Sequence, residues 1–283
     1  MKARGHATYS VSRFFRALLL VAGFALLLFS SISAEISPQY RERIATLISR
    51  LKTSGLSHEE LDRVFSDDRV ELYPQILERK AKGLQYMSRK FGLLTRKSID
   101  RGRRVLEDNR MLFSEIEQTY GVDKEIVIAI LRIETNFSSY VGSYPIFNSL
   151  LTLAVIENRR SAWAESELVE LFHIAQKLGR DPLSIRGSWA GAFGIAQFVP
   201  SSYVRFAVDG NGDGTIDLFD FSDATASIAN YLKAHGWKKN QPEKNRQAVY
   251  TYNHCDNYVT AVFTYAGAIG KGASPNRHKG VSR

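Results

Sequence analysis

The sequence predicts a mainly helical protein with a calcium-type loop and no substantial sheet. Apolar residues recur at helical spacing along most of the chain, and no run alternates convincingly over five or more residues. Glycines and capping residues stand where the periodic stretches begin and end. With 44% hydrophobic and 24% charged residues, the chain of 283 residues can bury a sizeable core, which argues against intrinsic disorder.

The first 34 residues have the composition of an export signal. Residues 1–16 hold four bases and no acid, the uncharged run from Ala17 to Phe29 follows, and small residues lead to Ala34. This is the order of a cleaved signal peptide, and the run is shorter than the roughly 20 residues of a spanning helix. We expect export to the periplasm, with an uncleaved inner-membrane anchor or a buried helix as alternatives. No cysteine lies near the cleavage zone, so a lipoprotein is not expected.

Charge and cysteine content narrow the function further. The net charge of +9 includes the four bases of the signal, so the mature chain carries only +5. This mild excess suits an anionic cell-wall polymer and gives no support for nucleic-acid binding. A single cysteine excludes an intramolecular disulfide, so stability must come from packing or from a metal.

Residues 35–119 are expected to form an N-terminal helical part of the domain. Ser57 and Glu60 form a capping box, Ile76 to Phe91 is a basic, amphipathic stretch, and Gly121 ends the last helix. The expected helices share apolar positions at a 3.6-residue period and cover Tyr40–Leu51, Ser57–Phe65 and Ser98–Tyr120.

Residues 120–270 are expected to form the core of the domain, and 271–283 a polar, basic tail. Asp123 is placed to cap the first of these helices, and Gly179 stands at a helix C-cap. Residues 187–198 form a glycine-rich segment and residues 209–220 a polar loop between helices. The expected helices are Asp123–Asn136, Phe147–Asn158, Ala162–Leu178, Asp223–His235 and Asn257–Ile269.

Glu134 is the candidate acid. Ile130 and Leu131 lie one turn before it and Phe137 three residues after it, so on a helix its carboxyl faces apolar neighbours. Desolvation there raises the pKa of a carboxyl, which keeps it protonated near neutral pH, as a general acid requires. The alternative is a hydrated or ion-paired glutamate at the helix edge.

The glycine-rich segment is a candidate for ligand binding. Gly187, Gly191 and Gly194 cost backbone entropy, and either a closely approaching ligand or tight helix packing explains them. Ser188 and Gln197 suit the hydroxyls and acetamides of a carbohydrate, whose rings also pack on aromatic side chains. No Lys-Ser or Lys-Thr follows the glycines, so this is not a phosphate loop.

The loop DGNGDGTIDLFD at 209–220 has the spacing of a calcium-binding loop. Gly214 stands at the sharp turn, Asp217 reaches the metal through water, and aspartate replaces the usual glutamate at the last position. The expected direct ligands are Asp209, Asn211, Asp213, the carbonyl of Thr215, and Asp220. The alternatives are an acidic turn without metal and a calcium sensor. Sensors generally pair such loops, and only one occurs here, so a structural calcium is favoured.

Several motifs together resemble the lytic murein transglycosylases of the membrane-bound lytic transglycosylase B family (glycoside hydrolase family 103). They are IETNF (133–137), GSWAGAFGIAQFVPSSY (187–203), the calcium-type loop running into DATASIANYLKAHGW (223–237), and TYNH (251–254). The resemblance covers roughly residues 120–270 and is weaker over 40–119. Familiar members carry a long insertion between HGW and the TYNH-like motif, whereas here thirteen residues separate Trp237 from Thr251, so this is a short form.

The resemblance implies a lysozyme-like fold and cleavage of the MurNAc–GlcNAc bond of peptidoglycan with formation of 1,6-anhydro-MurNAc ends. By motif position Glu134 is the one residue that serves as acid and then as base. Ser188 and Gln197 fall in the segment that lines the family's cleft. Tyr231, Tyr252 and Asn253 match polar groups near its catalytic centre. Helix packing is the alternative for Tyr231, and an ordinary turn for Tyr252 and Asn253.

The sequence therefore predicts a monomeric, periplasmic lytic transglycosylase that acts on peptidoglycan glycan strands with a structural calcium and no organic cofactor. A non-catalytic murein-binding protein on the same fold and a hydrolytic muramidase are the alternatives.

Overall fold

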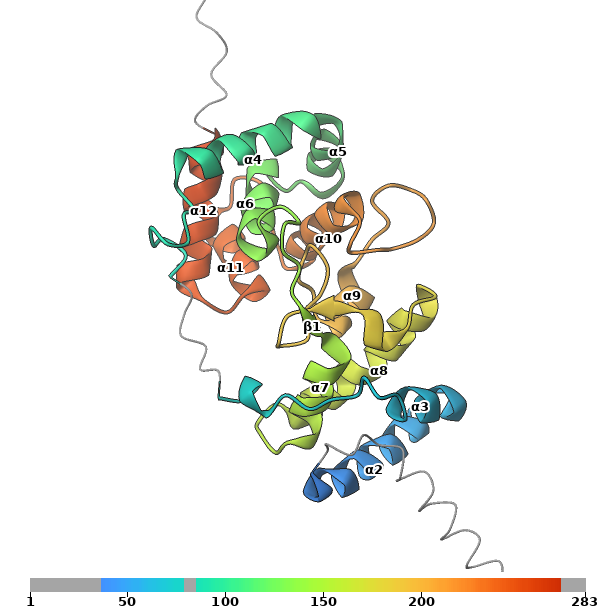
Figure 1. Cartoon of the computed structure of the whole chain (residues 1–283). Coiled ribbons are helices and arrows are strands. Elements are labelled where there is room, and N and C mark those ends of the chain that lie inside the picture. The colour runs from blue at the N-terminus through green and yellow to red at the C-terminus, as the bar shows by residue number, and fades with distance from the viewer. Residues whose placement is uncertain (1–36, 79–84, 271–283) are drawn as a thin grey trace, which may run out of the picture.

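The computed structural model describes residues 37–78 and 85–270, so the expectations for residues 1–34 and 271–283 lie outside it. Helices dominate this part of the chain, as predicted. Its sheet is limited to β1 (Tyr144–Pro145), paired antiparallel with β2 (Arg186–Gly187). In Figure 1, β1 lies between an upper and a lower group of helices. None of the helices in these two ranges is both long and apolar enough to cross a membrane.

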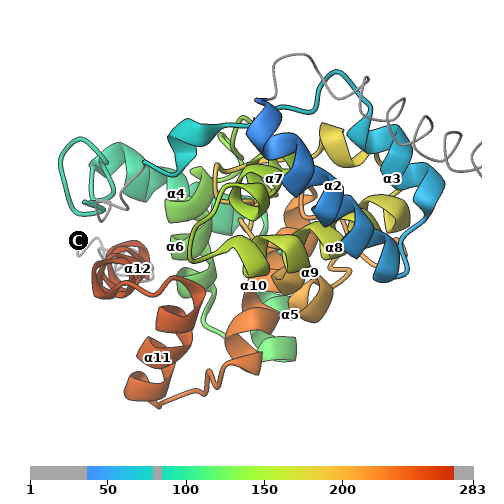
Figure 2. The ribbon, with the colours of Figure 1, turned by 90° about the horizontal axis from the view of Figure 1, so that it is seen from below.

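The lower group holds the N-terminal helices and a central helix pair. Its members are α2 (Pro38–Thr53), α3 (His58–Phe65), α7 (Ile146–Val155) and α8 (Ser161–Lys177). The capping box is confirmed, because Ser57 Oγ accepts a hydrogen bond of 3.3 Å from the Glu60 amide at the start of α3. α2 packs against α7, and Figure 2 shows this group on the side of the molecule away from α11 and α12.

The upper group surrounds α6, the helix that carries Glu134. Its members are α4 (Arg96–Asp108), α5 (Arg110–Tyr120), α6 (Lys124–Thr135), α10 (Phe221–Ala234), α11 (Pro242–Tyr252) and α12 (Asp256–Gly270). Every residue from Ile126 to Leu131 is buried, as expected of a helix that is apolar on all sides. α4, α5, α10 and α12 all pack against α6.

Two sequence expectations are corrected here. The helix expected over Ser98–Tyr120 is two helices, which meet at Asn109 (φ −119°, ψ 30°). Asn109 Nδ2 donates to the Val105 carbonyl at 2.9 Å, and such a side-chain bond competes with the helical backbone pattern. Asp123 does occupy the N-cap of α6, but its side chain makes no capping hydrogen bond.

The structure also adds to the sequence analysis in three other segments. In the basic, amphipathic stretch Ile76–Phe91, Ile76 ends the short 3-10 helix Pro74–Ile76, and the other described residues lie mainly in turns. Two further helices, α9 (Pro200–Phe206) and α11, went unpredicted, and α11 fills most of the stretch between Trp237 and Thr251. Both begin with proline, whose fixed φ suits the first position of a helix, so this start signal was overlooked.

One main hydrophobic core joins the two groups. It contains Ile44 of α2 and Ile269 of α12, with Phe147, Phe193 and Tyr258 between them in sequence. The glycine-rich segment lies between the groups, where Gly187 is held against neighbouring backbone. A Cβ at Gly187 would lie 2.0 Å from the Ala192 carbonyl oxygen, so only glycine fits this turn.

Candidate active site

Glu134 lies in the last turn of α6, where its carboxylate Oε1 accepts a hydrogen bond of 2.6 Å from Tyr258 Oη. Tyr258 stands near the start of α12 and is fully buried. Burial of the Glu134 carboxyl raises its pKa to about 7, and the hydrogen bond from Tyr258 only partly offsets that effect. Glu134 is therefore substantially protonated near neutral pH, in agreement with the sequence argument.

Tyrosines surround this carboxyl. Burial, followed by the negative charge of Glu134, raises the pKa of Tyr86 to about 12. The same two causes, in the same order, hold the pKa of Tyr252 and of Tyr258 well above the ordinary value. The Tyr86 ring meets the Tyr258 ring edge to face at 5.6 Å, and Tyr252 stacks on Tyr258 at 6.4 Å. The tyrosines stay neutral and act as an apolar wall with hydroxyl donors.

No second carboxyl is coupled to Glu134 within the described residues. Its pKa responds to burial and to Tyr258, and to no aspartate or glutamate. A hydrolase that retains configuration through two carboxyls needs them about 5 Å apart. The described residues thus offer one protonated acid rather than a pair.

The backbone turns sharply directly after the candidate acid. Asn136, Phe137 and Ser138 all have positive φ values, of 50°, 57° and 62°. Such runs are costly for residues other than glycine and persist where their surroundings hold them. Thr135 Oγ1 donates to the Ile195 carbonyl at 3.2 Å, which links this turn to the glycine-rich segment.

Ser188 and Gln197 mainly shape the glycine-rich segment. Ser188 Oγ accepts hydrogen bonds from the amides of Ala190 and Ala192, at 3.3 and 3.1 Å. Gln197 Nε2 donates to the Val141 carbonyl at 3.0 Å and to that of Gly194 at 2.8 Å. Neither side chain hydrogen-bonds Glu134 in the described structure.

Tyr231, Tyr252 and Asn253 do come together. Tyr252 Oη donates to the Ala196 carbonyl at 2.5 Å, which ties the end of α11 to the glycine-rich segment. The Tyr231 ring lies 4.9 Å from that of Tyr252, and its hydroxyl donates to the Thr251 carbonyl at 2.8 Å. Asn253 Nδ2 reaches Tyr86 Oη at 3.5 Å. Tyr231 therefore belongs to the aromatic packing behind Tyr252.

Sequence reasoning missed Tyr86 and Tyr258. Burial and the charge of Glu134 raise the pKa of both tyrosines, and Tyr258 also donates a hydrogen bond to Glu134. Tyr258 lies 124 residues further along the chain, and Tyr86 lies in the stretch that was read only as basic and amphipathic. The available signal was weak: a tyrosine on an apolar helix face needs a partner for its hydroxyl. Tyr258 meets that need through Glu134.

The carboxylates of the calcium-type loop bind the loop's own backbone. Asp209 accepts from the amides of Gly212 and Gly214 at 2.7 and 2.8 Å. Asp213 accepts from the Thr215 amide at 2.7 Å. Asp220 instead caps α10, where Oδ1 accepts from the amides of Ser222 and Asp223.

The donor types of this loop suit a hard cation, but its carboxylates are not gathered at one point. Among residues 37–78 and 85–270, no cluster of three or more His, Cys, Asp or Glu side chains could hold a metal. Asn211 and the Thr215 carbonyl would have to complete a ligand set. Asp217 forms an ion pair of 2.6 Å with Arg180.

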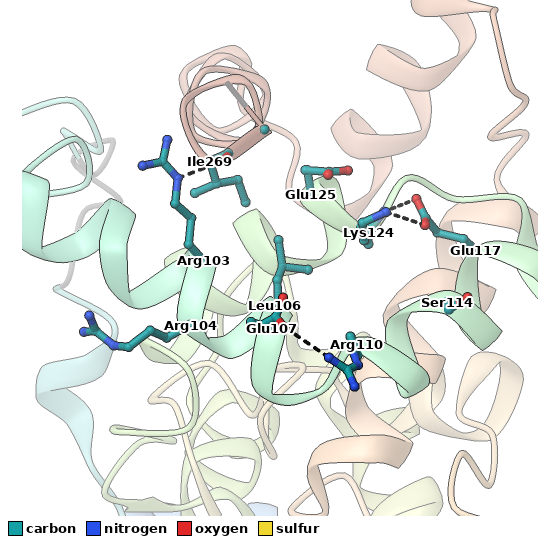
Figure 3. Close-up of a pocket in the computed structure, with 11 residues that line it drawn as sticks. Arg103, Arg104, Leu106, Glu107, Arg110, Ser114, Glu117, Lys124, Glu125 and Ile269 are labelled. Atoms are coloured by element: carbon teal, nitrogen blue, oxygen red, sulfur yellow. Dashed lines mark hydrogen bonds and ion pairs between the residues drawn. The ribbon is translucent and has the colours of Figure 1, made fainter. Parts of the chain in front are cut away.

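A cavity of about 570 Å³ lies at the other end of α6. Figure 3 shows its wall, where Arg110 pairs with Glu107 and Lys124 with Glu117. Arg103 donates to the carbonyls of Ala268 and Ile269 at the end of α12. Most cations of this cavity are thus neutralised or bound to backbone, in contrast to the lone acid at Glu134.

Comparison with known proteins places the chain among transglycosylases. A family described as "Transglycosylase SLT domain" matches residues 39–245. Membrane-bound lytic murein transglycosylase B of Escherichia coli K12 is 45% identical over 122 residues, which cover 43% of this chain and 34% of that protein. The match therefore spans about a third of the length of this curated relative.

Solved structures share the fold over most of their length. Lytic transglycosylase SltB1 from Pseudomonas aeruginosa is 27% identical, with a TM-score of 0.74, over 84% of this chain and 98% of that one. Escherichia coli SLT35 in complex with calcium is 25% identical, with a TM-score of 0.72, over 83% and 93%. Since the family match extends over well more than half of the sequence, the chain belongs to the SLT transglycosylase family.

Proposed function

We propose that this protein is a peptidoglycan lytic transglycosylase in which Glu134 is the only catalytic carboxyl. It cleaves the MurNAc–GlcNAc bond and leaves 1,6-anhydro-MurNAc ends. The single observation that carries this proposal is the state of Glu134: its carboxyl is desolvated and hydrogen-bonded to Tyr258, its pKa is raised to about 7, and it has no carboxyl partner among the described residues. Family membership and the murein transglycosylase relative support it.

The chemistry needs one group that first gives and then takes a proton. Protonated Glu134 donates to the glycosidic oxygen as its bond to C1 breaks, and the substrate's N-acetyl group stabilises the positive charge that develops at C1. The resulting carboxylate accepts the proton of the C6 hydroxyl, whose oxygen bonds to C1. Glu134 ends protonated again, and no water is consumed. A pKa near the working pH suits both steps.

Glu134→Gln tests the catalytic assignment. We expect digestion of purified peptidoglycan to fall by about 10²–10⁴-fold, which is the usual contribution of a general acid. Glu125→Gln, on the same helix and in the cavity away from the site, is the matched control and is expected to keep its activity. Unchanged digestion by the Glu134 variant would leave the non-catalytic murein-binding protein as the better reading.

Product masses separate a transglycosylase from a hydrolytic muramidase. Mass spectrometry of the released muropeptides is expected to show anhydro ends, one water lighter than reducing ends. A product pool made up of reducing ends would favour the muramidase.

Substrate contacts are proposed for Ser188, Gln197, Tyr231, Tyr252 and Asn253. The side-chain nitrogen of Gln197 donates to two backbone carbonyls. Its carbonyl oxygen is left to accept a hydrogen bond from an acetamide N–H of the sugar. Tyr252 and Asn253 stand beside the tyrosines that cover Glu134. Tyr231 supports Tyr252 from behind, so we assign it the most indirect contribution.

The loop 209–220 is proposed to bind one calcium ion through Asp209, Asn211, Asp213, the carbonyl of Thr215, and Asp220. Its oxygen donors and spacing support this, as does the calcium complex of the similar Escherichia coli protein. Each carboxylate oxygen of Asp209 and Asp213 that accepts from a backbone amide has a second lone pair, so these bonds leave room for the ion. We assign the ion a structural role, because the loop leads directly into α10.

We infer that the protein works outside the cytoplasmic membrane as a monomer on glycan strands, after export by residues 1–34. The order of basic, apolar and small residues in that stretch supports export. The N-terminal residue of the protein isolated from cells tests this: a start near Glu35 is expected, whereas a start at Met1 would favour an uncleaved anchor.

A further inference from the structure

Arg132 is a half-buried cation that the proposed chemistry does not use. It lies on α6 two residues before Glu134 and forms no ion pair with any described residue. Burial lowers its pKa. Even partial desolvation of a charge costs free energy, which a carboxylate partner would usually offset. A half-buried arginine without a carboxylate partner among the described residues therefore suggests a task other than stability.

Arg132 ties α6 both to the first turn of α4 and to the segment 85–95 that precedes it. Its Nε donates to Ser98 Oγ at 2.8 Å, and its Nη2 donates to the Phe91 carbonyl at 3.2 Å. The guanidinium also lies over the Phe91 ring, 5.3 Å from its centroid. Lysine could not make these two bonds and the ring contact at once, because it lacks the planar, forked guanidinium group.

Within the described part of the chain, few other polar contacts hold the segment 85–95. Most of its other hydrogen bonds to described residues are local, such as the one from the Gly92 amide to the Ser88 carbonyl. Apart from the bond from Arg132, one long-range hydrogen bond joins this segment to a described residue. It runs from Asn253 to Tyr86 and, at 3.5 Å, is at the limit for such a bond. Arg132 is thus the principal polar anchor of this segment.

This segment carries one of the rings that enclose the candidate acid. The ring of Phe91, held by Arg132, meets the Tyr86 ring edge to face at 5.6 Å. Tyr86 meets Tyr258 in the same way at 5.6 Å, and Tyr258 donates to Glu134. A continuous packed path therefore runs from Arg132 through Phe91, Tyr86 and Tyr258 to Glu134.

We propose that Arg132 is a positioning residue, which fixes the segment 85–95 against α6 so that Tyr86 keeps water away from the Glu134–Tyr258 pair. The inference rests on the proposed function only in naming Glu134 the acid. The groups that face Glu134 are Tyr258 of α12, Tyr252 of α11 and Tyr86, and all are neutral. Arg132 does not act on Glu134 through its charge, so its influence passes through packing.

The test replaces Arg132 with Met, which keeps the apolar length and removes the anchor. With Tyr86 loosened, water reaches Glu134, and its pKa is expected to fall by about one unit. NMR of carboxyl-labelled glutamate reports this titration without any activity assay, and the signal is assigned by its loss in Glu134→Gln. Amide exchange of Phe91 and Gly92 is expected to become faster.

Activity supplies a second readout. A fall of one unit from pKa 7 reduces the protonated fraction at pH 7 from one half to roughly a tenth, so kcat at pH 7 is expected to fall about fivefold. The alkaline limb of the pH profile moves to lower pH by the same amount, while KM stays nearly constant. Arg132→Lys, which keeps the charge without the fork, is expected to shift in the same direction.

Arg103→Met is the matched control. Arg103 likewise donates two hydrogen bonds to backbone carbonyls, but at the far end of α12. This variant is expected to lower thermal stability and to leave the Glu134 titration in place. Equal titration of Glu134 in the wild type, Arg132→Met and Arg103→Met would overturn the proposal. So would full rescue by lysine. A shifted titration in a chain that proves inactive toward peptidoglycan would instead reject the proposed function and keep this inference.

If Arg132→Met does not fold, Ser98→Ala provides a milder version. It removes the acceptor of Arg132 Nε and leaves the bond to the Phe91 carbonyl in place. A smaller shift of the Glu134 titration in the same direction supports the proposal, and no shift contradicts it.

Discussion

The carboxyl of Glu134 binds its proton more tightly than an ordinary glutamate does. On α6 it follows a run of buried apolar residues, and Tyr258 supplies its one side-chain hydrogen bond. Desolvation disfavours the charged form more strongly than that bond favours it, so the pKa rises to about 7. The strain of the following turn, with Asn136 to Ser138 at positive φ, fits a site kept for function rather than for stability.

This raised pKa predicts a pH-dependent effect of Glu134→Gln on stability. Below about pH 4.5 the carboxyl is neutral in both the folded and the unfolded chain. Between about pH 4.5 and 7 it ionises in the unfolded chain first, so the free energy of unfolding falls as pH rises and levels off above 7. The Gln variant escapes this loss, which amounts to at most about 3 kcal/mol.

Thermal melts of wild type and Glu134→Gln at pH 4.5 and pH 8 measure the effect. The variant is expected to gain stability over the wild type at pH 8 and little at pH 4.5. An equal difference at the two pH values would show that Glu134 is not desolvated.

At the scale of elements, close backbone contacts shape the site. β1 and β2 bring Gly142 and Gly187 together, and a Cβ on Gly142 would lie 2.1 Å from the Gly187 carbonyl oxygen. After β2 the chain turns back on itself, and single antiparallel β-bridges pair Gly187 with Phe193 and Phe193 with Phe198. Of the two explanations offered for the glycines of the segment 187–198, close packing rather than the approach of a ligand therefore accounts for Gly187, although the contact is with backbone and not between helices.

Gly187→Ala is expected to distort this segment. The added Cβ would lie 2.0 Å from the Ala192 carbonyl oxygen, so the turn has to open, at a cost of about 1–3 kcal/mol or more. Peptidoglycan digestion should fall as well, since Ala196 binds Tyr252. Gly267→Ala is the control: Gly267 is exposed on α12 with no atom near its Cβ position, and alanine should add up to about 1 kcal/mol. Denaturant unfolding of both variants decides the matter, and similar stabilities would refute the close-contact argument.

For the whole molecule, one core joins helices from both ends of the described chain. The single cysteine, Cys255, cannot form an intramolecular disulfide, so packing carries the fold, with a proposed calcium beside α10. An ion that binds only the folded chain adds stability by mass action.

Chelation is therefore expected to lower the melting temperature. At a free calcium concentration a hundredfold above the dissociation constant, its removal costs about 2.7 kcal/mol. Asp213→Asn should weaken this calcium dependence without touching Glu134. Melting curves with and without a chelator measure it, and identical curves for the wild type would argue against a structural ion.

Local patterns in the sequence were enough for most helices and for the apolar surroundings of Glu134. Apolar spacing located α2, α7, α8, α10 and α12, because a helix brings residues three and four apart to one face. The same spacing placed Glu134 among apolar neighbours. Motif order led to the family. Local patterns failed at Asn109, where one side-chain bond divides a long periodic stretch, and at α11, where polar composition concealed a helix.

The environment of the acid could not be read in this way. Tyr258 lies 124 residues after Glu134, and desolvation is the sum of contacts made by segments distant in sequence. Ser188 and Gln197 looked like free sugar-binding groups, and folding engages both with backbone. The residue types and their spacing thus established which groups are present and which helices carry them. The packing of distant helices set the proton affinity of Glu134, because the cost of burying a charge depends on everything that excludes water from it.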